Sequence, residues 1–175
     1  MDDSNRYILM WWDNGPDSAV VQRTAAEVNK IHVYSKYPRD FRTNEDFVFV
    51  LCYFAAGLHI VRERCGLPGY TTKMKTAAWK FWSEMAKQFL LAGDGDSVTR
   101  FPADFDGILA FIAEIESRRW THNEHGPDLV ERAVTPFVER YFPRPLHGVG
   151  RALVLGMAPD RRLESLGVSG SLASS

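Results

Sequence analysis

The fold is decided by residues 44–66, which read NEDFVFVLCYFAAGLHIVRERCG. Between the acidic start and the basic end of this stretch, only His59 interrupts a run of about 15 apolar residues, which is short of the ~20 that span a bilayer. Asn44 is a suitable N-cap, and the two acidic residues after it favour the positive end of a helix. The stretch therefore predicts a central core helix. Its expected buried line is Val48, Cys52, Ala55, His59 and Arg62.

The rest of the chain divides into further helix-length segments. Prolines and glycines separate them, and inside them apolar residues recur with a helical period and not with the alternation of a strand. Further helices are predicted over 19–34, from 71 or 72, from Pro102, from Pro127 and over 146–157. The helix from 71 or 72 is expected to bury Met74, Ala78, Phe81, Met85 and Phe89, and Pro136 is expected to kink or split the helix from Pro127. We therefore expect an all-α fold, a helical bundle of about six helices.

The composition is typical of one globular domain. The chain has 175 residues, of which 45% are hydrophobic and 25% are charged. Its 21 Lys and Arg residues balance 22 Asp and Glu residues, which gives a net charge of −1. A protein that binds nucleic acid is expected to carry a basic surface, so no nucleic-acid partner is predicted.

Export and membrane spanning are both unsupported by the sequence. Residues 2–6 are acidic and polar, without the basic and then apolar pattern of a signal peptide. Cys52 and Cys65 are interpreted as small buried hydrophobic residues in a reducing compartment, not as a disulfide scaffold. We therefore expect a cytoplasmic protein with no membrane span.

Several common catalytic signatures are missing from the sequence. There is no glycine-rich phosphate loop, no His-Glu-x-x-His or Glu-x-x-His pair, no Cys-x-x-Cys and no Gly-x-Ser-x-Gly. These absences argue against kinases, helical zinc or di-iron sites, thiol-redox proteins and esterases.

The histidines are the remaining candidates for chemistry. His32 continues the apolar stripe of the helix over 19–34, and His59 holds a similar position in the helix from 44. A buried imidazole needs a partner, so each is either a hydrogen-bonded core histidine or a ligand. The stripe that leads to His32 is Val21, Ala25 and Val28.

Three further histidines lie in polar surroundings. His122 and His125 flank a predicted turn, where they are either ordinary surface residues or a metal-chelating pair. His147 is expected to begin the last helix as a surface or capping residue.

Residues 23–32 read RTAAEVNKIH and resemble the Arg-Thr-Ala-x-x-Val-x-x-x-His segment of the latex-clearing-protein and MpaB-type oxygenase family. Further segments resemble the family in the same order, so the resemblance covers about residues 18–168. These segments are NEDF at 44–47, GLPGY at 66–70, AWKFW at 78–82, FPADF at 101–105, FIAEIE at 111–116, YFP at 141–143, GRA at 150–152 and DRR at 160–162.

The resemblance implies an all-helical protein that binds haem b and oxidatively cleaves a hydrophobic small-molecule substrate of the isoprenoid type. His32 would be the proximal ligand of the haem iron. Arg23 and Lys30 would approach the propionates, or else are solvated surface residues. His59 would hydrogen-bond near the pocket or simply pack. Three aromatic residues would line a substrate cavity or pack in the core, namely Trp79, Phe81 and Trp82.

One departure from the family concerns the N-terminus, where only 22 residues precede Arg23. Family members carry more helical sequence there, with the residues of the oxygen-activating side. We therefore expect an N-terminally shortened member, with an N-terminal segment 1–17 that holds a strand or turn at 7–12, a helical domain 18–168 and a disordered tail 169–175. A homo-oligomer or a partner chain would then complete the pocket. The alternative is a non-catalytic helical module that binds a partner protein.

Overall fold

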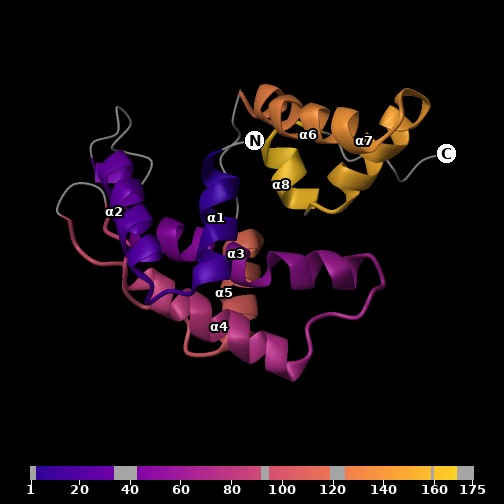
Figure 1. Ribbon diagram of the computed structural model, residues 1–175. Helices are drawn as coiled ribbons and strands as arrows, with labels where there is room; N and C mark the ends of the chain where they lie inside the picture. The colour runs from indigo at the N-terminus through magenta and orange to yellow at the C-terminus, as the bar shows by residue number, and fades with distance from the viewer. Residues whose placement is uncertain (1–2, 34–42, 92–94, 119–124, 159, 169–175) are drawn as a thin grey trace. The chain divides into compact units, whose positions relative to one another are not determined.

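The structure is a computed structural model that describes residues 3–33, 43–91, 95–118, 125–158 and 160–168. Within these ranges it contains eight α-helices, one short 3-10 helix and no strand, which confirms the all-α prediction (Figure 1). A single antiparallel bridge joins Leu90 to Ser97 in the described part of the chain. The predicted tail 169–175 lies outside the described residues.

The chain divides into two compact units, Met1–Ile112 and Ala113–Ser175, where the sequence predicted one helical domain over 18–168. Helix α5 (Phe105–Ser117) crosses the boundary between them.

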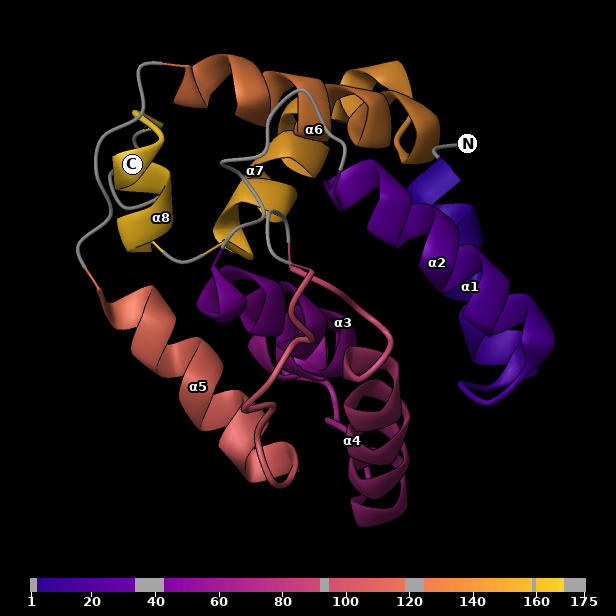
Figure 2. The same cartoon turned by 90° about the vertical axis from the view of Figure 1, so that its left-hand side faces the viewer.

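The first unit holds α1 (Asp3–Asn14), α2 (Ala19–Val33), α3 (Asn44–Arg64) and α4 (Thr72–Ala86). Helices α1 and α2 pack side by side, as Figures 1 and 2 both show, and α3 packs against α4. Apolar residues of these helices form the core of the unit, with α3 at its centre as predicted.

Helix α1 corrects the expectation of a strand or turn at 7–12. Residues 3–14 are helical, and Trp11 and Trp12 anchor this helix to separate partners in the unit. The buried indole of Trp11 donates a hydrogen bond from Nε1 to Thr24 Oγ1 at 2.8 Å. The ring of Trp12 stacks on Phe81 of α4, with centroids 5.2 Å apart.

Helix α3 begins close to the predicted place. Its N-cap is Thr43, not Asn44, and Thr43 Oγ1 accepts a hydrogen bond from the backbone N–H of Asp46 at 3.2 Å. The predicted line is buried at Val48, Cys52, Ala55 and His59, and partly buried at Arg62.

Helix α3 is also the one described helix that is long and apolar enough to cross a membrane, by length and composition only. A core helix passes the same test, and 44% of its apolar window is buried inside the protein. It gives no clear membrane span.

The prediction that both cysteines are buried holds for Cys52 and is wrong for Cys65. Cys52 lies on the core face of α3, whereas Cys65 is exposed at the C-cap of that helix. Both thiols are free. The helix ends at Arg64, and Gly66, just after the C-cap, has a φ of 70° that suits glycine.

Helix α4 starts as predicted, because Thr71 is its N-cap and Thr71 Oγ1 accepts from the backbone N–H of Met74 at 3.3 Å. The predicted buried stripe is wrong at Met74, which is exposed, and at Phe81, which is half-buried. Trp82 takes the central core position instead, since the buried face follows the spacing i, i+4, i+7, i+8 and i+11. That face consists of Ala78, Trp82, Met85, Ala86 and Phe89.

Helix α5 does not begin at Pro102 as predicted. It begins at Phe105, because the side chain of Asp104 caps the helix and its Oδ1 accepts from the backbone N–H of Gly107 at 2.7 Å. The carbonyl of Pro102 accepts a hydrogen bond from Trp79 Nε1 at 2.9 Å, which ties this segment to α4.

The second unit contains α6 (Gly126–Tyr141), the 3-10 helix η1 (Arg144–Leu146), α7 (His147–Gly156) and α8 (Asp160–Ser165). Helices α6 and α7 pack on each other, as Figure 2 shows. The small core of the unit is formed by Val130, Val134 and Val138 with Phe142, Val154, Leu155, Leu166 and Val168.

Of the predictions for the two prolines of α6, the one for Pro127 is confirmed and the expected split at Pro136 is not seen. Pro127 lies in its first turn as predicted. Pro136 does not split the helix, which continues to Tyr141. Pro136 is exposed, so water can replace the hydrogen bond that the missing N–H would have made.

Candidate functional site

His32 lies in the last turn of α2. Its ring packs edge-on against Phe47 in the first turn of α3, with centroids 5.1 Å apart and an interplanar angle of 71°. Partial burial lowers the pKa of the His32 imidazole below its ordinary value of 6.5. The side chain is therefore neutral at pH 7, which is the state in which an imidazole binds a metal ion.

Arg23 and Lys30 lie on the opposite side of α2 from His32. Arg23 precedes His32 by nine residues, about two and a half turns, and Lys30 precedes it by two residues, slightly more than half a turn. Both side chains are exposed. The structure thus does not bring these two cations to the face of α2 that carries His32.

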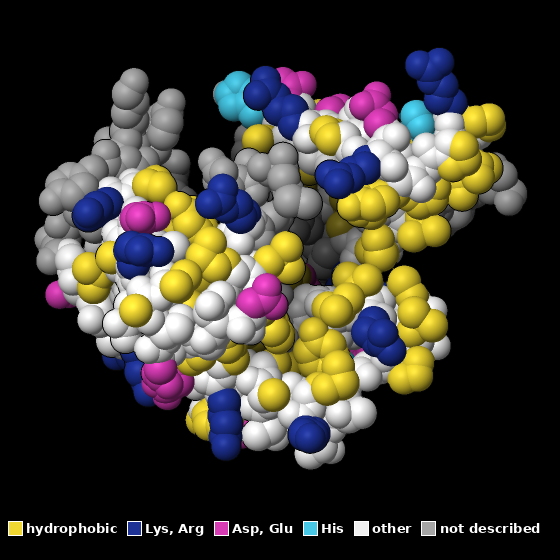
Figure 3. Space-filling model, viewed as in Figure 1, with side chains coloured by type: hydrophobic (Ala, Val, Ile, Leu, Met, Phe, Trp, Pro, Cys, Tyr) yellow, Lys and Arg dark blue, Asp and Glu magenta, His cyan; other side chains and the backbone are white. Residues whose placement is uncertain are grey.

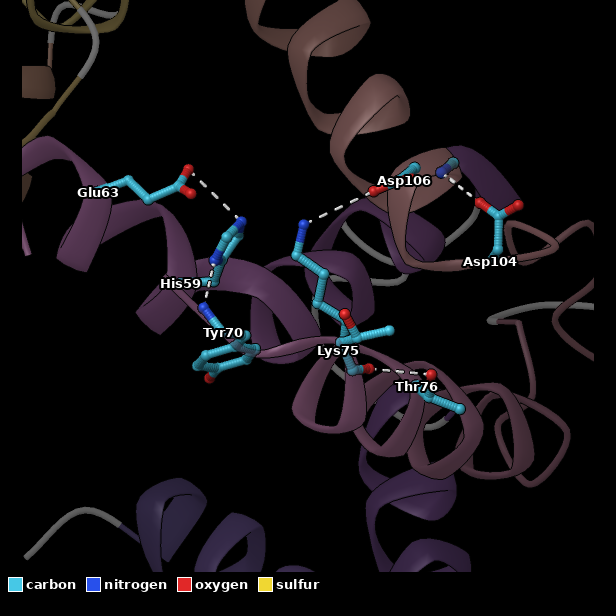
Figure 4. A network of polar contacts seen from close by, with 9 residues as sticks. His59, Glu63, Tyr70, Lys75, Thr76, Asp104 and Asp106 are labelled. Carbon is cyan, nitrogen blue, oxygen red and sulfur yellow. Dashed lines mark hydrogen bonds and ion pairs between the residues drawn. The ribbon is translucent and has the colours of Figure 1, made fainter. Parts of the chain in front are cut away.

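His59 is buried within the first unit, with only 2% of its surface exposed. Its Nδ1 accepts a hydrogen bond from the backbone N–H of Tyr70 at 2.9 Å, and its Nε2 lies 3.5 Å from Glu63 Oε2 (Figure 4). Because Nδ1 accepts, the ring proton of the neutral form is on Nε2, which faces the carboxylate. Both ring nitrogens contact protein groups, as expected for a hydrogen-bonded core histidine.

The turn between α3 and α4 is closed around this imidazole. A Cβ atom added at Gly69 would lie 2.4 Å from His59 Nδ1, so only glycine fits there. Arg62 Nε donates to the carbonyl of Pro68 at 2.6 Å and holds the same turn from the other side. Burial raises the pKa of the Tyr70 hydroxyl, and the charge of Arg62 partly offsets this rise.

Charged residues near His59 form a surface pair beside it. Lys75 Nζ lies 3.8 Å from Asp106 Oδ1 (Figure 4). It also lies 5.6 Å from the centroid of the Phe105 ring, and that ring lies 5.3 Å from the His59 ring. Asp106 is strongly exposed, so the pair contributes little to stability.

His32 and His59 do not lie together. Phe47, which contacts His32, precedes His59 by twelve residues on α3, and this corresponds to about 18 Å along the helix. His32 has the neutral imidazole that an axial ligand of haem iron requires. The other three candidates, Arg23, Lys30 and His59, do not gather around it.

A partly buried polar network holds α2 in place, and the sequence did not predict it. The side chain of Asn29 donates from Nδ2 to the carbonyl of Gln88 at 2.8 Å and accepts at Oδ1 from the backbone N–H of Leu90 at 3.0 Å. Gln88 Nε2 donates to the carbonyl of Pro16 at 2.6 Å. The available signal was a polar residue four positions after Ala25, on the buried face of α2.

The three aromatic residues proposed for a substrate cavity all take part in packing. Trp79 is anchored to Pro102, and Trp82 is fully buried. Phe81 stacks on Trp12. These contacts correspond to the core-packing interpretation of the three residues.

The remaining histidines lie in the second unit or outside the described residues. His122 is outside them, His125 is exposed at the N-cap of α6, and His147 begins α7 with Nε2 3.1 Å from the carbonyl of Phe142. In the described part of the chain, no group of three or more His, Cys, Asp or Glu residues is placed to hold a metal ion.

Comparison with known proteins assigns no family to the chain. No family model matches it, and no curated protein matches it. The resemblance to the latex-clearing-protein and MpaB-type family therefore stays a prediction that rests on the segments quoted from the sequence.

Proposed function

We propose that this chain binds haem b through His32 and acts as an oxygenase-like domain on an apolar substrate of the isoprenoid type. The observation that carries the proposal is the neutral, partly buried imidazole of His32 at the end of the segment RTAAEVNKIH. Bound haem would supply the activation of dioxygen, and the protein would supply the axial ligand and a pocket that excludes water.

The surroundings of His32 suit a ligand that must keep one orientation. The Phe47 ring packs against the imidazole in a T-shaped arrangement. Asn29, one turn earlier in α2, fixes that helix to the backbone at Gln88 and Leu90. A ligand on a helix that is anchored in this way loses little conformational freedom when it binds iron.

The test is a titration of the purified chain with hemin, followed by absorption spectroscopy. We expect a sharp Soret band at one haem per chain, which His32→Ala abolishes while the helical circular dichroism is retained. His147→Ala is the matched control, because that imidazole contacts only a backbone carbonyl in the second unit among the contacts described above, and it should keep the band. A Soret band of full strength in His32→Ala would contradict the ligand assignment.

A second candidate function, a helical module that binds a partner protein, is supported by α3. Val50, Phe54 and Leu58 are 47%, 39% and 61% exposed, and they form one row along α3. Phe54 also packs on the Trp82 ring of α4, with centroids 5.2 Å apart. Figure 3 shows hydrophobic side chains at the surface over this helix. We call these three residues the α3 stripe, and an exposed apolar stripe of this kind is typical of an interaction surface.

The second candidate is tested with an apolar fluorescent dye. The wild-type chain, diluted until sedimentation shows it to be monomeric, is expected to bind the dye at the α3 stripe, and Leu58→Glu is expected to remove most of that fluorescence. Leu9→Glu on α1 is the control, because Leu9 is exposed to the same degree, 60%, outside the stripe. Equal dye binding by the wild type and Leu58→Glu would contradict this function.

A further inference from the structure

We propose that the α3 stripe is covered by a second copy of this chain, with the two α3 helices packed antiparallel about a two-fold axis near Phe54. This inference rests on the second candidate function and names its partner.

Helix α3 is apolar on all sides. No charged residue occurs between Asp46 and Arg62, so the exposed side of the helix is as apolar as the buried side. A helix of this kind normally lies inside a larger core, with neighbours around its whole circumference. The first unit covers one side of α3 and leaves Val50 and Leu58 largely exposed. Phe54, between them, is 39% exposed and packs its other side on the Trp82 ring of α4, with centroids 5.2 Å apart.

The spacing of the stripe suits another helix as its neighbour. Val50, Phe54 and Leu58 follow each other at intervals of four residues, which aligns them in one row over about 12 Å of the helix. Rows of this kind are the ridges by which two helices interlock.

The charges near the two ends of the stripe indicate that the neighbouring helix is α3 of a second copy. Asp46 and Arg64 are both exposed, and they are eighteen residues apart, about five full turns, so they lie on the same side of α3. Asp46 precedes the stripe by one turn, and Arg64 lies beyond the other end of the stripe on the side of the helix that Asp46 occupies. An antiparallel second copy would place Asp46 of each chain opposite Arg64 of the other.

The charged residues and the apolar residues give nearly the same position for the two-fold axis. Ala55 is midway between Asp46 and Arg64, next to Phe54, and Phe54 is midway between Val50 and Leu58. A two-fold axis at this point pairs Phe54 with its own copy and Val50 with Leu58 of the other chain. Such self-complementarity is required of a two-fold interface, whereas a parallel pairing would bring like charges together.

The first test is the mass of the protein in solution, measured by sedimentation between about 1 and 100 µM, where a modest helical interface is expected to associate. We expect the wild type to form a dimer, and Leu58→Glu and Val50→Glu to be monomers with unchanged helical content. Leu9→Glu, the control outside the stripe, should remain a dimer. A wild type that is monomeric at all concentrations, or dimers of both stripe variants, would overturn the inference.

The orientation is tested by charge exchange and by cross-linking. Arg64→Glu should raise the dimer dissociation constant about tenfold, and the double variant with Asp46→Lys should recover most of the loss. In a Cys65→Ser background, Phe54→Cys should form a disulfide-linked dimer on mild oxidation. Leu58→Cys should not, because two copies of residue 58 would be about 12 Å apart along the helices. Cross-linking through residue 58 but not through residue 54 would contradict the antiparallel register.

These measurements separate the two proposals. A monomeric wild type whose dye binding is still lost in Leu58→Glu overturns the second copy as partner and leaves the partner-binding function in place. If the dye binding is also unchanged in Leu58→Glu, both proposals fail.

Discussion

His59 and Tyr70 are joined by a partly buried hydrogen bond in which the backbone N–H of Tyr70 donates to His59 Nδ1 at 2.9 Å. This bond links the last turns of α3 to the residues just before α4. An imidazole thus replaces the carbonyl that a regular element would offer this N–H group, and it fixes the path of the turn.

Removing the acceptor from this bond is expected to destabilise the first unit. His59→Leu keeps an apolar side chain of similar size but leaves the Tyr70 N–H without its acceptor, which costs about 2 kcal/mol. Urea denaturation measures the loss, and faster hydrogen exchange at the Tyr70 amide localises it. Glu63→Gln is the control and should change stability by less than about 0.5 kcal/mol, because Glu63 is largely exposed. Equal stability of His59→Leu and wild type would contradict this role.

Gly69→Ala is expected to destabilise the protein by disturbing the contact between His59 and the turn before α4. The added methyl group would overlap His59 Nδ1, since the Cβ position is 2.4 Å from that atom, and we expect a loss of about 2 kcal/mol. Gly57→Ala in α3 provides the comparison, because its Cβ would meet nothing closer than 3.7 Å and alanine favours a helix interior. Thermal denaturation should therefore rank Gly57→Ala at or above wild type and Gly69→Ala clearly below it. The opposite order would refute the close approach.

Asn29→Leu is expected to release α2 from the turn after α4. The substitution removes two partly buried hydrogen bonds to backbone groups at Gln88 and Leu90, which costs about 2–3 kcal/mol. Trp11→Phe is a milder comparison, because it removes one buried bond to Thr24 and is expected to cost about 1 kcal/mol. Denaturant midpoints of the two variants measure the difference. A smaller loss in Asn29→Leu than in Trp11→Phe would argue against the anchoring role.

His32 is expected to make the folded protein less stable as the pH falls below 6.5. Burial lowers the pKa of its imidazole in the folded state below the ordinary value of 6.5, so the unfolded chain binds the proton more readily. The contribution of His32 to stability is complete above pH 6.5 and is lost as the pH falls through the lower, folded pKa. Denaturation of the wild type and of His32→Gln across this range measures the effect, and the variant should show the shallower slope. Identical slopes would contradict the prediction.

The two cysteines should differ in reactivity. Burial raises the pKa of the Cys52 thiol to about 12, so at pH 8 almost none of it is the reactive thiolate, whereas Cys65 is exposed. A thiol reagent should label one equivalent rapidly in the native protein and a second only after denaturation. Mass spectrometry should place the first label on Cys65. Rapid labelling of Cys52 in the folded protein would contradict its burial.

The parts of the fold that depend on nearby residues could be predicted from the sequence. Thr71 as the N-cap of α4 and Pro127 in the first turn of α6 are examples, because caps and first-turn prolines act within three or four residues. The prediction at Pro102 was wrong because the capping bond from Asp104 competes for the same helix start.

The candidate site was harder to predict because it depends on contacts between distant segments. His32 and His59 appear equivalent in the sequence, since each lies on an apolar helical stripe. The structure distinguishes them, because Tyr70 and Glu63 contact the two nitrogens of His59 whereas His32 packs on the Phe47 ring. The helical period alone does not contain this information.

The sequence by itself determined that this protein is all-α and that α3 is its central helix, because apolar periodicity and capping are local properties that each segment expresses on its own. Only the tertiary structure decided that Trp82 and not Phe81 enters the core, that Asn29 anchors α2, and that one side of α3 remains exposed. These features depend on which surfaces meet, and a segment's own residues do not specify the surface that packs against it.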